Sequence, residues 1–297
     1  MKISLIISTY NRPDALKLCL LSAISQSYNA DEIIIGDDGS TVETSETINE
    51  IRRLTTIPII HVWHEDKGFR LAMMRNKSVA ASSGDYIIEI DGDIILHRDF
   101  ISDHAKLARK GHYLKGGRTN LGKKLTAALC KSGRLIKINI FTHGIESKPE
   151  NSLHLLPIAK MIAPYYRQHK ETAIGCNMSF FREDFEKING YDEFFEGWGG
   201  EDGDFGRRLQ RAGVKKRQLK FAGIVYHLWH EDKYMYNKQL NFDYSMRKDE
   251  EQPIRCRDGV DKYLEGEVEV AEEGVVGGRA DDEGFGDKGW RDNGDFP

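Results

Sequence analysis

The stretch GDYIIEIDGD, residues 84–93, decides the fold of this chain. Residues 86–90 are a short, mostly apolar run rich in isoleucine, which predicts a buried strand. A helical pattern over about residues 70–82 precedes it and ends before Gly84, as helices commonly do at glycine. The strand ends on Asp91-Gly92-Asp93, and open α/β sheets bind their ligands at the carboxyl ends of strands. We therefore expect acidic site residues at this edge of a sheet.

Towards the N-terminus, short β-branched runs alternate with amphipathic helical patterns. This alternation predicts an α/β fold with a parallel sheet between two layers of helices. The runs are residues 3–7, 33–36 and 57–63, and the helical patterns are residues 13–24 and the segment around 48–54.

The turn after the first run, Ser8-Thr9-Tyr10-Asn11-Arg12, contains no glycine. A dinucleotide-binding Rossmann domain needs G-x-G-x-x-G at this place, and a P-loop needs G-x-x-x-x-G-K-[ST]. Both common phosphate cradles are therefore excluded here, and any phosphate must be bound in another way.

Towards the C-terminus the pattern is less regular. We expect a helix over residues 98–110, a poorly patterned region over 119–172, a helix from Glu201 to about Arg211 and a strand over 214–227. From about residue 265 the chain is acidic and rich in glycine, with few large apolar residues, which predicts a disordered tail. The chain thus divides into residues 1–118, 119–264 and 265–297.

The composition is that of a globular protein: 297 residues, 39% hydrophobic, with a formal net charge of −4. This charge gives no attraction to nucleic acid. The four cysteines are far apart, without a C-x-x-C pair, so neither a zinc knuckle nor a disulfide framework is indicated. No apolar run approaches the ~18 residues of a membrane span, so we expect a cytoplasmic protein; peripheral contact with the inner face of a membrane stays open.

Two carboxylates one residue apart, Asp91 and Asp93, can hold a hard divalent cation that also binds phosphate oxygens. The alternative for this motif alone is an ordinary turn or helix cap. Asp38, in Asp37-Asp38-Gly39-Ser40, can accept a hydrogen bond from a pyrimidine N3–H or a ribose hydroxyl. Asp-Gly-Ser is equally suited to a turn that begins a helix.

The segment WGGED, residues 198–202, combines an aromatic ring that can stack on a sugar with two carboxylates at a helix start. Acidic residues are common at helix starts, but the preceding Trp198-Gly199-Gly200 favours function. The helix dipole predicts a lowered pKa for both Glu201 and Asp202.

His227 follows the predicted strand and would complete a metal site as a neutral imidazole, with His230 as the competing ligand. A lone histidine among aromatic residues is otherwise a core residue. Arg70 and Arg75 could reach a base or a diphosphate, or could lie on a solvated helix face. Because they are five residues apart, we expect at most one to point into the site.

Together these motifs make the sequence resemble the family 2 inverting glycosyltransferases of the GT-A fold. The opening residues 6–12, the Asp37-Asp38-Gly39-Ser40 turn, the block 84–93 and Glu201-Asp202 occur in the family's order. Residues 197–204 resemble the W-G-G-E-D segment of β-1,4-galactosyltransferases and bacterial chondroitin-polymerase domains. The resemblance covers about residues 3–230, although Gly203 stands where the galactosyltransferase segment carries another acid.

The resemblance implies a GT-A domain with a single mixed, mostly parallel sheet, in which residues 1–118 bind the nucleotide-sugar and 119–264 the acceptor. It implies Mn²⁺ (or Mg²⁺) bound by Asp93 and His227, and Asp202 as the general base. The acceptor-binding residues would be Glu201 and Trp198. The donor-binding residues would be Thr9, Tyr10, Arg12, Asp38, Arg70, Arg75, Asp91 and Gly92.

The implied reaction moves a sugar, galactose or an N-acetylhexosamine type, from a UDP-sugar to a hydroxyl of a carbohydrate or glycolipid with inversion, for surface glycan or polysaccharide synthesis. Two alternatives remain at this point. A sugar nucleotidylyltransferase would need a glycine- and lysine-rich loop that residues 8–12 lack. A non-catalytic carbohydrate-binding protein would need neither a metal nor a base.

Overall fold

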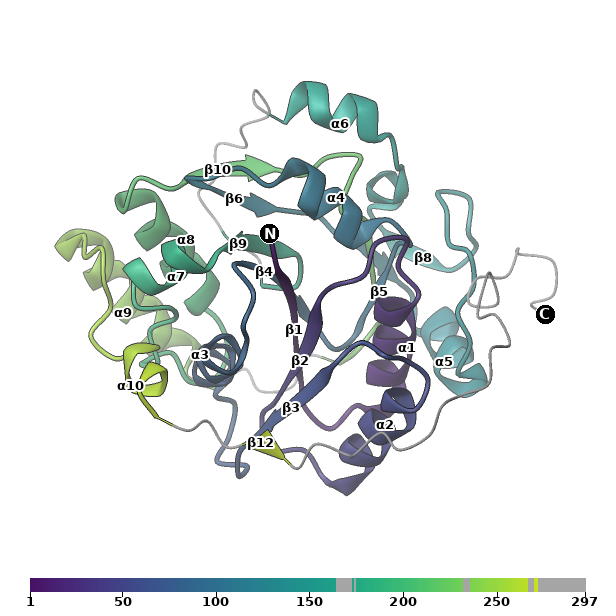
Figure 1. Cartoon of the computed structure of the whole chain (residues 1–297), viewed down its shortest axis with the longest axis horizontal. Helices are drawn as coiled ribbons and strands as arrows, with labels where there is room; N and C mark the ends of the chain where they lie inside the picture. The colour runs from purple at the N-terminus through teal and green to yellow at the C-terminus, as the bar shows by residue number, and fades with distance from the viewer. Residues whose placement is uncertain (164–172, 174, 232–235, 267–269, 272–297) are drawn as a thin grey trace.

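A computed structural model describes residues 1–163, 173, 175–231, 236–266 and 270–271 (Figure 1). Its main sheet has the strand order β10-β6-β9-β4-β1-β2-β3-β12. The strands are β1 (Ile3–Thr9), β2 (Glu32–Asp37), β3 (Ile59–Trp63), β4 (Tyr86–Asp91), β6 (His112–Lys115), β9 (Met178–Phe181), β10 (Lys215–Gln218) and β12 (Val270–Ala271). The four strands β3, β2, β1 and β4 run parallel, whereas β9 is antiparallel to both β4 and β6.

Alternate residues of the parallel strands enter two separate cores. Leu5 packs towards α1 (Pro13–Ile24), α2 (Val42–Arg52) and α4 (Phe100–Leu107). Ile6 packs on the other face, towards α3 (Leu71–Ala81), α7 (Arg182–Lys187) and α8 (Glu201–Arg211). Figure 1 shows these two groups of helices on opposite sides of the strands. The predicted mixed, mostly parallel sheet flanked by helices is confirmed, and its β-branched residues are buried on both faces.

A second sheet, in the order β5-β11-β7-β8, adjoins the main one. Its strands are β5 (Ile94–Leu96), β7 (Thr119–Leu121), β8 (Ile145–Ser147) and β11 (Val225–His227). Because β11 runs antiparallel to β5 with His227 opposite Ile94, the end of β11 lies beside Asp93.

The single strand predicted over residues 214–227 is wrong. The segment forms β10 in the main sheet and β11 in the second sheet. Between them Phe221 and Gly223 have φ angles of 62° and 59°, which an extended strand cannot accommodate. This turn carries the chain from one sheet to the other.

The poorly patterned region 119–172 is more regular than expected. Besides β7 and β8 it contains α5 (Lys123–Ser132), the 3₁₀ turn η1 (Pro149–Ser152) and α6 (Leu156–Ile162). Thr126 and Leu129 of α5 are buried, and Leu125 and Cys130 pack partly buried against the same core. The apolar face is short but has helical spacing. Residues 164–172 lie outside the described residues.

The helix predicted over 98–110 is shorter, because Ala108 already has an extended ψ of 137°. The chain continues with α9 (Lys238–Glu251) and α10 (Asp261–Leu264). Most of the tail from 265 falls outside the described residues, so its predicted disorder and the division into three parts stay predictions. Within the part of the chain that is described, the helices are all too short or too polar to cross a membrane.

Candidate functional site

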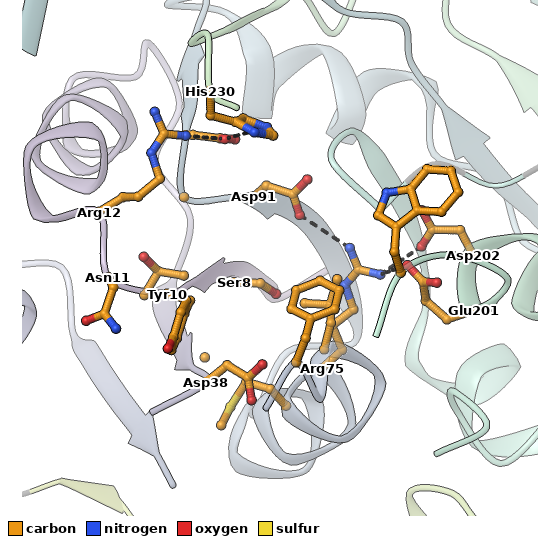
Figure 2. Close-up of a pocket in the computed structure, with 18 of the residues that line it drawn as sticks. Ser8, Tyr10, Asn11, Arg12, Asp38, Arg75, Asp91, Glu201, Asp202 and His230 are labelled. Atoms are coloured by element: carbon orange, nitrogen blue, oxygen red, sulfur yellow. Dashed lines mark hydrogen bonds and ion pairs between the residues drawn. The ribbon is translucent and has the colours of Figure 1, made fainter. Parts of the chain in front are cut away.

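A pocket of about 680 Å³ lies at the carboxyl ends of β1, β2 and β4 and the start of α8 (Figure 2). Parallel strands that end at one edge bring side chains from distant parts of the sequence together there. All predicted site residues except Arg70 line it. The lining is Ser8, Thr9, Tyr10, Asn11, Arg12, Gly36, Asp38, Phe69, Leu71, Met74, Arg75, Asp91, Gly92, Asp93, Arg118, Trp198, Gly199, Gly200, Glu201, Asp202, His227, His230 and Glu231.

The glycine-free turn after β1 forms the floor of the pocket. The Thr9 carbonyl accepts a hydrogen bond from the Asp38 amide at 3.1 Å, which joins this turn to the one after β2. The Tyr10 hydroxyl donates to Asp66 Oδ2 at 2.7 Å. Asn11 adopts a left-handed φ of 45°, which asparagine tolerates better than most residues, and the chain then enters α1 at Pro13.

Asp38 is buried and held on both carboxylate oxygens. His64 Nε2 lies 2.6 Å from Oδ1, and the Arg70 amide donates to Oδ2 at 2.8 Å. Arg70 thus supports the site through its backbone, whereas its guanidinium donates to the Glu65 carbonyl, away from the pocket. The sequence analysis missed His64, although its position directly after β3 places it at the same edge.

Gly92 lies directly against the end of β1. Its amide donates to the Ser8 carbonyl at 2.7 Å, and a Cβ atom here would lie 3.0 Å from Thr9 Oγ1. Because glycine has no side chain, the turn can pack this closely against β1 while Asp91 and Asp93 on either side of it both line the pocket.

Asp93 and His227, the predicted ligands, lie together with His230, the competing candidate, and the ligand atoms of all three lie within 4.8 Å of one another. The Nε2 atoms of His227 and His230 lie 3.6 and 3.5 Å from the Asp93 carboxylate. Asp93 Oδ1 is buried and has no hydrogen-bond partner among the described residues. One carboxylate and two imidazoles form a donor set suited to Mn²⁺ and similar ions.

The charge states of this cluster also suit a cation. Burial, reinforced by the nearby Arg118 charge, lowers the pKa of His227 to about 3, so the imidazole is neutral at physiological pH. Burial raises the pKa of Asp93, and the Arg12 guanidinium, 2.6 Å away, opposes that change. Without a bound cation, the Arg12 guanidinium is therefore the positively charged group that contacts Asp93.

Arg75 lies between the two sides of the pocket, as Figure 2 shows. Its guanidinium contacts Asp91 at 3.3 Å and Asp202 at 2.7 Å, and it also lies 3.1 Å from Glu89. The residue is 1% exposed, so its alternative interpretation as part of a solvated helix face is wrong. A sequence signal for this role existed, because Glu89 lies within a buried strand and needs a cationic partner.

The start of α8 is shaped by the glycines before it. Gly197, Gly199 and Gly200 all have positive φ angles, which glycine adopts without strain. The Asp202 carboxylate accepts a hydrogen bond from the Gly175 amide at 2.9 Å, in addition to its Arg75 contact. Its position is thus fixed from both sides.

The predicted effect of the helix dipole on Glu201 is wrong. Burial, together with the neighbouring Asp202 charge, raises the pKa of Glu201 to about 7. The cost of placing a second negative charge in a water-poor site exceeds the stabilisation by the helix N-terminus.

Trp198 is 46% exposed and lines the pocket, and the Lys238 ammonium lies over its ring, 5.1 Å from the centroid. Hydrogen bonds to Tyr236, just before α9, and to Asn241 of α9 hold the loop that carries Trp198. The Trp198 amide donates to the Tyr236 carbonyl at 3.2 Å, and Asn241 donates to the Glu196 carbonyl at 2.9 Å.

Arg118 is a pocket residue that sequence reasoning missed. It directly precedes β7, at the boundary of the poorly patterned region 119–172. Within the described ranges it makes no ion pair, and its guanidinium lies 3.7 Å from Cys176 Sγ. It is thus a cation of the pocket without a carboxylate partner there.

Comparison with solved structures identifies the fold as GT-A. The chain superposes on a mannosyltransferase, PcManGT from Pyrobaculum calidifontis in complex with GDP-Man and Mn²⁺, with a TM-score of 0.56, 16% identity and coverage of 83% of this chain and 64% of that one. A fragment of S. aureus TarS in complex with UDP gives a TM-score of 0.58 at 16% identity, covering 89% and 70% of the two chains.

Sequence relatives include the chondroitin synthase of Escherichia coli, 26% identical over 245 residues, which are 76% of this chain and 34% of that protein. The validoxylamine A glucosyltransferase of Streptomyces hygroscopicus subsp. limoneus is 25% identical over 71% of this chain and 48% of its own length. The chain thus spans less than half the length of these two relatives.

Two family models match the sequence. One, described as the N-terminal domain of galactosyltransferase, matches residues 157–231, which include the WGGED segment and His227. The other, glycosyl transferase family 2, matches residues 4–189, more than half of the chain. The protein therefore belongs to glycosyl transferase family 2.

Proposed function

We propose that this protein is a metal-dependent inverting glycosyltransferase that moves a sugar from a UDP-sugar, of the galactose or N-acetylhexosamine type, to a hydroxyl of a carbohydrate or glycolipid acceptor. Surface glycan or polysaccharide synthesis is the corresponding process. The observation that carries the proposal is a single pocket with a carboxylate–imidazole cluster on one side and a positioned carboxylate, Asp202, on the other.

The nucleotide would bind over the ends of β1 and β2. Thr9 and Asp38 are joined there by a backbone hydrogen bond. Asp38 lines the pocket, and His64 contacts one of its carboxylate oxygens. Tyr10, Arg12, Gly92 and Asp91 line the same pocket. Asp91 would contact the ribose or the sugar. We propose UDP as the nucleotide because one structural neighbour was solved in complex with UDP.

The Asp93, His227 and His230 cluster fits a divalent ion, because Asp93 has a buried oxygen without a partner and His227 is neutral. When bound, Mn²⁺ (or Mg²⁺) stabilises the negative charge that develops on the leaving diphosphate. Arg12, which contacts Asp93 at 2.6 Å, could then bind a diphosphate oxygen instead, because guanidinium groups bind phosphate as well as carboxylate.

Asp202 would act as the general base. Arg75 and the Gly175 amide each occupy one lone-pair direction of its two oxygens, and a carboxylate has about four such directions. The acceptor hydroxyl transfers its proton to Asp202 while its oxygen attacks the anomeric carbon. The bond between that carbon and the diphosphate breaks on the opposite face, which inverts the configuration. Glu201 and Trp198 would orient the acceptor ring.

Calorimetry with UDP tests this proposal. We expect binding by the wild type in Mn²⁺ and at least about tenfold weaker binding with EDTA or in Asp93→Asn, because metal ligation of the diphosphate is lost. Asp243→Asn, an exposed position on α9, is the matched control and should bind as the wild type does. Absence of UDP binding by the wild type in Mn²⁺ would refute the UDP-donor assignment.

The family match gives no support to the nucleotidylyltransferase alternative. A binding-only protein would bind UDP-sugars or glycans without releasing UDP. Measuring UDP release with a panel of UDP-sugars and acceptor glycans separates that outcome from transfer.

A further inference from the structure

A second group of metal-binding side chains lies outside the pocket, where β5 leads into α4. His97 directly follows β5, Asp99 directly precedes α4, and His154 lies just before α6. Each of the three offers a ligand atom within 4.8 Å of those of the other two. The imidazole rings of His97 and His154 stack with their centroids 4.6 Å apart. The fold thus brings two histidines from distant parts of the sequence into contact beside a carboxylate.

Outer hydrogen bonds orient these side chains. His154 Nε2 donates to Asp103 Oδ2 at 2.9 Å, and the buried Asp103 is itself fixed by the Gly223 amide at 2.9 Å. Asp99 Oδ1 accepts a hydrogen bond from Ser27 at 2.6 Å, which leaves Oδ2 directed towards His97, 3.9 Å from Nδ1. Carboxylates behind a histidine and hydrogen bonds to a ligating carboxylate are characteristic of protein metal sites.

The donor set suits a transition metal ion rather than Mg²⁺ or Ca²⁺, which prefer oxygen ligands. Two imidazoles and one carboxylate bind Zn²⁺ at about 2.0–2.2 Å, with water in the fourth position, so ligand atoms in such a site lie about 3.4 Å apart. Side-chain shifts of about 1 Å would reach this geometry. The three side chains are 23%, 33% and 24% exposed, so an ion and a water molecule have access from solvent.

We propose that His97, Asp99 and His154 bind one Zn²⁺ ion, or a chemically similar divalent transition metal, at a site separate from the pocket. The two clusters lie at opposite ends of β5, because Asp93 precedes this strand and His97 follows it, about 13 Å apart along an extended chain. The ion would connect the start of α4 to the segment before α6. It stabilises the folded state, because it binds an arrangement that the unfolded chain lacks.

Metal titration of protein purified without a histidine tag tests this proposal. The background is a His227→Gln/His230→Gln variant, in which the imidazoles of the pocket cluster are absent. We expect this variant to bind one Co²⁺ or Zn²⁺ per chain, measured by Co²⁺ absorption and by calorimetry. Adding His97→Gln or His154→Gln should weaken binding at least about tenfold. In the same His227→Gln/His230→Gln background, Zn²⁺ should raise Tm, and adding His97→Gln should abolish that increase.

The matched control is His143→Gln, which removes an exposed histidine elsewhere on the surface and should leave the titration unchanged. Circular dichroism verifies that each variant is folded, and the two histidine variants provide independent tests. Equal affinity in the background and in both added variants would overturn the proposal, as would the absence of binding in the background. In either case His154 and Asp103 would form an ordinary ion pair.

Discussion

Arg75 is the residue through which the two sides of the pocket are linked. Its guanidinium holds Asp91 of β4 and Asp202 of α8, and it lies against the buried Glu89. Burial raises the pKa of Glu89 to about 7 even though Arg75 lowers it, so the carboxylate depends strongly on this cation. A Cβ on Gly175 would overlap the Arg75 guanidinium at 1.9 Å, which shows how tightly the chain encloses it. Removing Arg75 would leave the buried Glu89 and the partly exposed Asp91 and Asp202 without this counter-charge.

At this scale we predict that Asp202→Asn lowers turnover by a factor of about 10²–10⁴, because an amide cannot accept the acceptor's proton. UDP affinity should change little, because the nucleotide residues lie on β1 and β2, away from α8. Steady-state rates of UDP release and calorimetry with UDP measure the two effects, with Asp243→Asn as the control. Turnover at the wild-type rate would disprove the assignment of the base.

At the scale of elements, the site depends on where strands stop and helices start. β1, β2 and β4 end at one edge and supply Thr9, Asp38 and Asp91. The glycine turn before α8 points the helix N-terminus, with Glu201 and Asp202, at the same pocket. The antiparallel pairing of β5 with β11 places His227 and His230 beside Asp93. Each element contributes one or two side chains, and none forms the site alone.

The turn before α8 gives an element-scale prediction. Gly200 has a φ of 105°, and a Cβ there would lie 2.5 Å from the Phe195 ring. Gly200→Ala should therefore displace the WGGED turn and lower kcat by at least about tenfold, with an additional loss of stability of about 1–3 kcal/mol from backbone strain. Kinetics and urea denaturation measure the two quantities.

The matched control is Gly203→Ala, one turn further along α8. A Cβ there meets only the flexible end of Arg207 at 3.1 Å, and alanine stabilises a helix interior by up to about 1 kcal/mol over glycine. If both variants kept wild-type activity, the turn geometry would not be required for function.

At the scale of the whole molecule, a three-layer α/β unit and a small second sheet share the pocket between them. The second sheet contributes β11 and, just before β7, Arg118, whereas the main sheet contributes Thr9, Asp38 and Asp91 at or just after its strand ends. Buried polar contacts join distant elements elsewhere as well. His104 of α4, fully buried, contacts Ser179 of β9 at 2.7 Å and Asn177 at 3.2 Å.

His104 makes the stability of the whole fold dependent on pH. Burial lowers its pKa to about 4 from an ordinary value of 6.5. Below pH 6.5 the histidine of the unfolded chain binds a proton, whereas His104 of the folded protein stays neutral down to about pH 4. The contribution of the neutral histidine to the free energy of unfolding is therefore complete above pH 6.5 and is lost as the pH falls from 6.5 to about 4. His104→Gln, which cannot titrate, should reduce the loss between pH 7.5 and 5 by about 2 kcal/mol.

Urea denaturation of both proteins at the two pH values measures this difference. His143→Gln, an exposed position, should follow the wild type at both values. If His104→Gln lost as much stability as the wild type, the histidine would not be the titrating group.

The sequence alone determined the α/β class, the position of Thr9, Asp38 and Asp91 at or just after strand ends, and the family resemblance. These follow from local information, because hydrophobic period and turn residues act within a few positions of the chain. It predicted neither α5 nor the division of residues 214–227 between two sheets. The apolar face of α5 is short, with Leu125, Leu129 and Cys130, and the division depends on a turn whose φ angles are set by the surrounding packing.

Only the tertiary structure decided which charges meet. No local pattern shows that Arg75 meets Asp202, because this ion pair joins residues 127 positions apart. Arg118 and His64 likewise reach the site only in the folded chain. The pKa of Glu201 was predicted in the wrong direction for the same reason. A helix dipole can be inferred from the sequence around residue 201, but burial and neighbouring charges are properties of the folded chain.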